Sequence, residues 1–121
     1  MQYMALIYGD EERWSAFSEE ERKEVKGRYR ALAGEAQAAG VMAGGDELAL
    51  TRDATTVRVR GHETLVTDGP YAELKEALGG YFLFECDTLD EALDWAARIP
   101  AAEHGAVEVR PVFVDPAEPQ L

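Results

Sequence analysis

Short apolar runs alternate along this chain with stretches of helical periodicity. Residues 3–8 form an apolar run that stops at Gly9-Asp10, which predicts a buried strand. Ser18 and Glu21 have the spacing of a capping box, and the helix that they predict covers residues 19–39 before Gly40. Gly27 and Gly34 lie inside this helix at a cost of about 1 kcal/mol each relative to alanine, so we expect another segment to pack closely there. The apolar stripe of the helix consists of Val25, Tyr29, Leu32, Ala33 and Ala36.

The middle of the chain has the pattern of β-structure. Residues 55–60 alternate with period two, and residues 64–68 follow after a turn, which predicts a β-hairpin. Asp68-Gly69-Pro70 ends the second strand, and Pro70 suits the first position of a short helix over Tyr71–Leu78. A strongly apolar strand over residues 81–86 comes next.

The last third repeats the strand–helix–strand order. Thr88 and Glu91 predict the start of a second amphipathic helix, and Ala106–Val114 predicts the last strand, with Val107, Val109 and Phe113 on one face. The whole order predicts an α+β fold, a ferredoxin-like split β-α-β plait with an inserted β-hairpin. Residues 1–114 then form a single domain, and residues 115–121 form a loosely ordered C-terminal tail.

The predicted sheet is apolar on both faces. Tyr81 and Leu83 alternate with Phe82 and Phe84 along one strand, so large apolar side chains point both ways. Two helices can cover only one of these faces. We therefore expect a homodimer that packs sheet to sheet.

Charge and composition narrow the possible partners. The 121 residues include 12 Lys+Arg and 24 Asp+Glu, so the net charge of −12 disfavours nucleic acid and membrane surfaces as partners. A single cysteine, Cys86, cannot form an intramolecular disulfide, which favours a cytoplasmic location and a buried, inert thiol. With His62 and His104 as the only histidines, the sequence has no zinc-finger pattern, and we expect no metal or cofactor.

Several spaced segments together resemble the YCII-related family, and specifically its DGPF-type branch. Asp68-Gly69-Pro70-Tyr71 stands where that branch has Asp-Gly-Pro-Phe. The resemblance implies a dimeric α+β barrel of ferredoxin-like protomers. Some relatives use a His–Asp pair whose histidine would fall on the first helix, but Tyr29 lies at roughly that place, so the pair does not carry over. The segments that carry the resemblance are residues 3–8, 54–58, 66–73, 75–81, 89–92, 96–100 and 107–112.

Asp68 is the candidate catalytic residue. At the end of a strand it is placed to act as a general base or to anchor a substrate hydroxyl or amine. The alternative is an Asx turn or a cap for the short helix that follows.

Arg58, Glu73, Lys75 and Tyr81 are the candidate ligand-binding residues. Arg58 suits a carboxylate, which Arg binds bidentately, or alternatively a structural ion pair. Tyr81 would anchor an oxyanion or a carboxylate. Glu73 and Lys75 would line a pocket or remain solvated, and their spacing puts them on different faces of a helix.

Three functions stay open at this point. The first is binding of a small metabolite in a pocket between helices and sheet, near Asp68 and Tyr81. The second is cofactor-free acid–base catalysis on a small carbonyl or cyclic metabolite, with Asp68 as the base. The third is an interaction or regulatory module, for which the resemblance implies an association with transcription regulation.

Overall fold

The computed structural model describes residues 1–117, which form one four-stranded antiparallel sheet and a separate two-stranded hairpin. The sheet has the strand order β2-β5-β1-β6. Its strands are β1 (Gln2–Gly9), β2 (Met42–Glu47), β5 (Ala77–Glu85) and β6 (Ala106–Pro111). The predicted α+β class and ferredoxin-like arrangement are confirmed.

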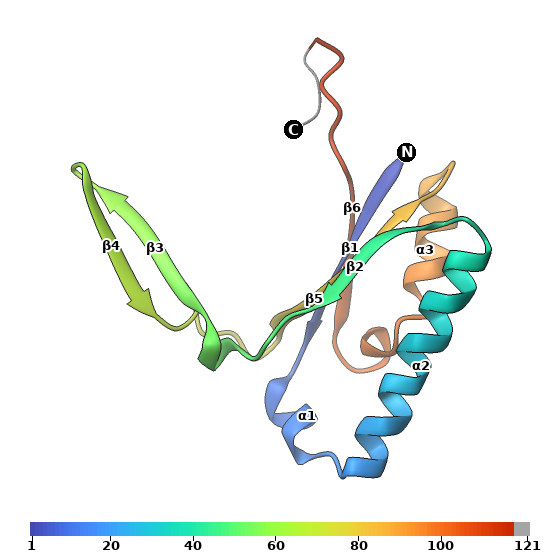
Figure 1. Cartoon of the computed structure of the whole chain (residues 1–121), viewed down its shortest axis with the longest axis horizontal. Helices are drawn as coiled ribbons and strands as arrows, with labels where there is room; N and C mark the ends of the chain where they lie inside the picture. The colour runs from blue at the N-terminus through green and yellow to red at the C-terminus, as the bar shows by residue number, and fades with distance from the viewer. Residues whose placement is uncertain (118–121) are drawn as a thin grey trace.

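Helices α2 (Glu19–Ala38) and α3 (Leu89–Ala96) lie on the same side of this sheet (Figure 1). A shorter helix, α1 (Glu11–Ala16), connects β1 to α2, and the chain also forms two 3-10 turns, η1 (Thr51–Asp53) and η2 (Pro100–Glu103). The predicted capping box of α2 is present. The Glu21 amide donates to Ser18 Oγ at 3.1 Å, and the Ser18 amide donates to the Glu21 carboxylate at 2.9 Å.

The core lies between the sheet and these helices. Tyr3, Ala5 and Ile7 of β1 point toward the helices, as their alternation requires. The Phe84 and Ile99 side chains are completely buried, and the rings of Phe82 and Phe84 stack with centroids 5.7 Å apart. The predicted burial of Cys86 in this core is confirmed.

No helix of the described residues lies on the other face of the sheet (Figure 1). Met4 pairs with Leu83 and Leu6 pairs with Tyr81, so apolar side chains lie next to one another on this face. Glu108 and Arg110 of β6 lie opposite Leu6 and Met4. We call this surface the open sheet face.

The predicted hairpin is present and projects away from the sheet (Figure 1). It consists of β3 (Thr55–Arg60) and β4 (Glu63–Asp68). Gly61 and His62 at its tip both have positive φ, 56° and 68°, as a type I′ turn requires. Val57 and Val66 pair across it with 61% and 64% of their surfaces exposed, so no other part of residues 1–117 covers these side chains.

The predicted short helix over Tyr71–Leu78 is wrong. Residues 71–76 have no helix, and β5 begins at Ala77. Ala77 and Leu78 pair with Gly9 and Tyr8 of β1, so the last two residues of the expected helix belong to the sheet instead. In the remaining residues 71–76, the large side chains of Tyr71 and Leu74 are 74% and 56% exposed, so no apolar face is packed that would stabilise a short helix.

Two smaller expectations also need correction. The last strand ends at Pro111 rather than Val114, because its partner β1 begins at Gln2, whose carbonyl accepts from the Val112 amide at 2.8 Å. Phe113 is 75% exposed rather than on the apolar face.

Gly27 and Gly34 face open space, with nothing within 4 Å of an added Cβ, so close packing does not explain these two glycines. Of the predicted tail, residues 118–121 lie outside the described residues.

Candidate functional site

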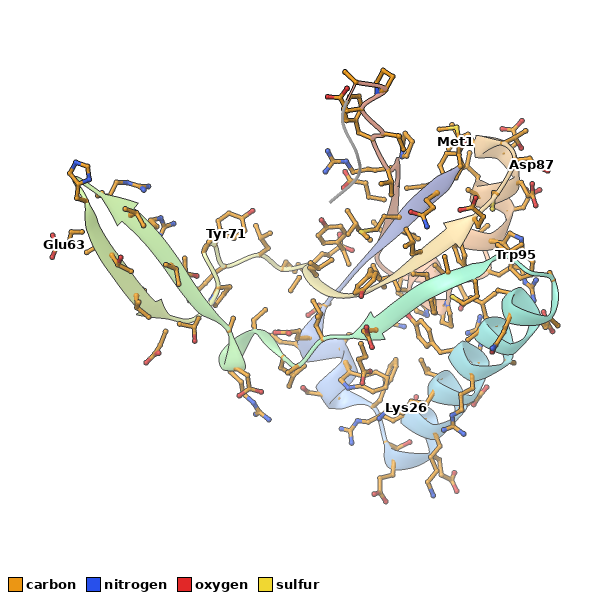
Figure 2. All side chains as sticks on the ribbon, turned by 45° about the horizontal axis from the view of Figure 1, so that its top comes forward. Met1, Lys26, Glu63, Tyr71, Asp87 and Trp95 are labelled. Carbon is orange, nitrogen blue, oxygen red and sulfur yellow. The ribbon has the colours of Figure 1, made fainter. Side chains whose placement is uncertain are left out.

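A cleft of about 530 Å3 lies where α1 and α2 approach the β2–β5 edge of the sheet. Its walls come from α1, α2, β2 and the segment after β2, the start of β5, and the η2–β6 connection. These segments are far apart in sequence. Figure 2 shows Lys26 at this end of the molecule, where α2 approaches α1.

Hydrogen bonds from both sides hold α1 in place as one wall. Asp10 caps this helix by accepting from the Glu12 amide at 3.0 Å. The Arg22 guanidinium of α2 donates to the Trp14 carbonyl at 3.3 Å and to the Ser15 carbonyl at 2.9 Å. On the other side, the Glu11 carboxylate accepts from the Thr51 amide at 2.8 Å and from its hydroxyl. These hydrogen bonds therefore fix the position of α1 as one wall of the cleft.

Aromatic and aliphatic side chains make up much of the lining. Trp14 and Phe17 meet edge to face with ring centroids 5.9 Å apart. Tyr29 and Phe82 also line the cleft, and the centroids of their rings lie 6.3 Å apart. Further apolar lining residues are Ile7, Val25, Ala33, Leu48 and Leu50. This lining suits the apolar body of a small molecule.

Charged side chains frame the apolar lining. The acids are Asp10, Glu11, Asp46 and Glu47, and the cations are Arg13, Lys26, Arg28 and Arg30. Arg28 is engaged in an ion pair, because its Nη1 donates to the Glu103 carboxylate at 3.0 Å. This pair connects α2 to η2, and its hydrogen bond lowers the pKa of the Glu103 carboxyl.

Tyr29 brings a hydroxyl into the cleft from the middle of α2. Burial raises the pKa of this phenol, and the charge of Glu47 raises it further, while the Ala101 backbone opposes the shift. The phenol therefore stays protonated at neutral pH and can donate a hydrogen bond. His104 also lines the cleft, beside Gly105.

Of the residues predicted from sequence, Tyr81 is the one that contributes to the cleft lining, although its pairing with Leu6 places its side chain on the open sheet face; the other four do not line the cleft. The Tyr81 hydroxyl donates to the Asp46 carboxylate at 3.1 Å, and this bond raises the pKa of Tyr81. Arg58 and Asp68 belong to the hairpin. Glu73 and Lys75 are exposed in the connection to β5.

The surroundings of Asp68 contradict one of its interpretations. Residues 71–76 have no helix, so Asp68 caps no helix there, while its role as a base or anchor and the Asx turn stay predictions. The chain turns instead through Gly69, which has φ +100° and donates from its amide to the Ala54 carbonyl at 2.7 Å. Figure 2 shows the hairpin, from Tyr71 near its base to Glu63 near its tip, well away from Lys26.

Sequence reasoning missed the residues on α1 and the polar flank of α2. Two aromatic residues, Trp14 and Phe17, within an otherwise acidic segment were the available signal. Lys26 and Arg30 lie off the apolar stripe, and their spacing of four residues places them on one side of α2.

Cys86 provides a test of the packing beside the sheet. Burial raises the pKa of its thiol, and the nearby Glu91 carboxylate adds to the shift. We expect Ellman's reagent to label Cys86 slowly at pH 8 in the folded protein and rapidly in denaturant. Because the thiol pKa is higher in the folded state, stability should fall as the pH rises through the pKa of the unfolded state. Equally rapid labelling in both states would contradict the burial.

Two classes of site find no support within residues 1–117. No group of three or more His, Cys, Asp or Glu side chains is arranged to hold a metal ion in this part of the chain. No helix in the same residues has the length and apolar composition needed to cross a membrane.

The fold and the cleft define a ferredoxin-like α+β protein with a ligand-sized cleft between helices and sheet edge. The model of the YCII-related domain matches residues 1–114, and the chain belongs to this family. A relative in Rhizobium meliloti (strain 1021), the uncharacterized protein R00369, is 41% identical over 114 residues. The alignment covers 93% of this chain and 92% of the relative.

Proposed function

We propose that this protein binds a small, largely apolar metabolite in the cleft between α1, α2 and the sheet edge. The observation that carries the proposal is the combination of volume and lining. The cleft measures about 530 Å3 and includes aromatic rings from three elements, Trp14, Tyr29 and Phe82. Small-molecule sites commonly have ~300–1,000 Å3 and an apolar lining with few polar groups.

A thermal-shift screen against carboxylates, phosphates, phenols and sugars tests this proposal. Specific binding to the folded state adds about 2.7 kcal/mol at a hundredfold excess over Kd, so a ligand should raise Tm clearly. We expect Ala33→Trp, which fills the cleft from α2, to abolish the shift. Ala31→Trp is the matched control, because Ala31 is an exposed residue of the same helix outside the cleft.

The two variants also define the failure of the proposal. A hit that survives Ala33→Trp binds elsewhere and would contradict the cleft as the site. If no compound of the four chemical classes raises Tm, the result would contradict the proposal and favour an interaction or regulatory module.

We also propose that the protein is a homodimer that packs through the open sheet face. Met4, Leu6 and Leu83 are adjacent on this face, no helix of residues 1–117 covers them, and Val57 and Val66 are exposed on the projecting hairpin. A two-fold pairing would cover the same apolar surface on both copies at once. An isolated two-stranded ribbon is marginally stable in water, so the hairpin also gains from a cover.

Light scattering tests the dimer. We expect twice the chain mass of 13.3 kDa at micromolar concentration, and the single-chain mass for Leu83→Glu, which places a charge on the open sheet face. Leu93→Glu is the control, because Leu93 is 43% exposed on α3. A single-chain mass for the unmodified protein would overturn the proposal.

Two finer assignments belong with this proposal. Asp68-Gly69-Pro70-Tyr71 supports the DGPF-type branch of the family, since Tyr differs from Phe only by a hydroxyl. A single buried cysteine supports a cytoplasmic location.

A further inference from the structure

We propose that the ligand of this cleft is a small apolar carboxylate, whose anionic group is bound by Lys26 and Arg30 of α2 at the mouth of the cleft. The inference rests on the proposed function, because it names the chemical class that the same site accepts. It assigns a binding role to two residues that lie outside the apolar stripe of α2.

The first argument is the distribution of charge. The chain has 12 Lys+Arg and 24 Asp+Glu, so a random surface would show two acids for each cation. The residues that line the cleft instead include four of each, and the Asp46 carboxylate lies beside Tyr81 on the open sheet face; the residues are Arg13, Lys26, Arg28 and Arg30, and Asp10, Glu11, Asp46 and Glu47. Cations are thus concentrated at this place in an acidic protein.

The second argument is that most of the lining acids already have protein partners. Asp10 accepts from the Glu12 amide, Glu11 accepts from Thr51, and Asp46 accepts from the Tyr81 hydroxyl. Glu47 is the one lining acid without such a hydrogen bond among residues 1–117. These donors are neutral and leave the carboxylates charged, but they hold the carboxylates in place, and none of the four acids forms an ion pair with Lys26 or Arg30 among the described residues.

The third argument is that two of the cations have no such partner. Arg28 is paired with Glu103, and the Arg13 guanidinium lies 5.6 Å from the centre of the Phe17 ring. Lys26 and Arg30 form no ion pair with any of the described residues. They are four residues apart on one side of α2, where like charges destabilise a helix. A bound anion would compensate this repulsion.

The surroundings favour a carboxylate on an apolar body. Tyr29 can donate a hydrogen bond from its protonated hydroxyl, and Arg30 can bind a carboxylate bidentately. The Trp14, Phe17 and Phe82 rings lie beside these donors and suit a ring or a short apolar chain. A polyphosphate fits less well, because it would leave this aromatic lining unused.

The test compares two ligands of the same ring and nearly the same size, one with a negative charge and one without. We would measure Kd by calorimetry for 2-naphthoate and for its uncharged amide, 2-naphthamide. We expect 2-naphthoate to bind at least about tenfold more tightly, and increasing salt to weaken only the carboxylate. The double variant Lys26→Gln/Arg30→Gln should remove this preference and leave the affinity for 2-naphthamide within about twofold.

Lys23→Gln is the matched control for Lys26→Gln. It removes a cation from the same helix at an exposed position outside the cleft, so the preference for 2-naphthoate should persist. Both positions are exposed, so loss of folding does not complicate the comparison.

The outcomes separate this inference from the proposed function. If both compounds bind equally and Ala33→Trp abolishes both, the cleft is a ligand site but the carboxylate inference is overturned. A preference for 2-naphthoate that survives in Lys26→Gln/Arg30→Gln also overturns it. If neither compound binds and the wider screen is blank, both the inference and the proposed function fail.

Discussion

Phe84→Ala is expected to lower the free energy of unfolding by about 3–5 kcal/mol. The Phe84 side chain is completely buried on β5, stacked with Phe82 and next to Trp95, with ring centroids 5.7 and 6.4 Å away. Truncation removes the transfer free energy of the ring and leaves a cavity that these neighbours cannot fill without moving. Since small domains have total stabilities of about 5–15 kcal/mol, the loss takes a large part of the whole.

Urea unfolding followed by tryptophan fluorescence measures this loss. Phe113→Ala is the matched control, because the same side chain is removed where it is 75% exposed, and we expect a change within about 0.5 kcal/mol. Similar losses for the two variants would mean that Phe84 does not lie in the core.

The core of the fold follows directly from periodicity. Tyr3, Ala5 and Ile7 alternate with Met4 and Leu6 at period two, and a one-residue shift would exchange the two faces. Because the alternation also appears in β5, the apolar character of both sheet faces could be predicted. The capping signal at Ser18 likewise predicted the start of α2, since it depends on local backbone geometry alone.

The short helix shows what a local signal leaves out. Pro70 is compatible with a helix start, but the decision depends on Tyr8 and Gly9, which pair with Leu78 and Ala77. Tertiary pairing of this kind overrides a weak local propensity. A local pattern contains no information about a strand more than sixty residues away.

The candidate site depends still more on contacts between distant segments. Tyr81 could be found because it lies on the apolar strand that forms the cleft edge, whereas Trp14 and Lys26 come together only through the packing of α1 against α2. Asp68 and Arg58 were predicted as site residues from the chemistry of their side chains and their local sequence, yet they lie on the projecting hairpin. Their functional roles stay predictions.

Gly105→Ala is expected to destabilise the protein by about 1–3 kcal/mol and to weaken binding in the cleft together. An added Cβ at Gly105 would collide with the Tyr8 carbonyl and approach Gly9 Cα to 3.2 Å. Tyr8 pairs with Ala106, so the clash would push the end of β1 away from the start of β6. Gly9 and Gly105 both line the cleft, so the same movement should change its shape.

Gly34→Ala is the control that separates this clash from the general effect of replacing glycine. Gly34 lies inside α2 with nothing within 4 Å of an added Cβ, so alanine should stabilise the protein by up to about 1 kcal/mol. Urea unfolding measures the change in the free energy of unfolding for each variant. Changes of opposite sign would show that the backbone clash, rather than chain entropy, dominates at Gly105. Gly105 lies against the end of β1, and both line the cleft. The Gly105→Ala variant should therefore lose ligand affinity as well as stability, and Gly34→Ala should keep its affinity. Full affinity in a destabilised Gly105→Ala would place the ligand away from this end of the cleft.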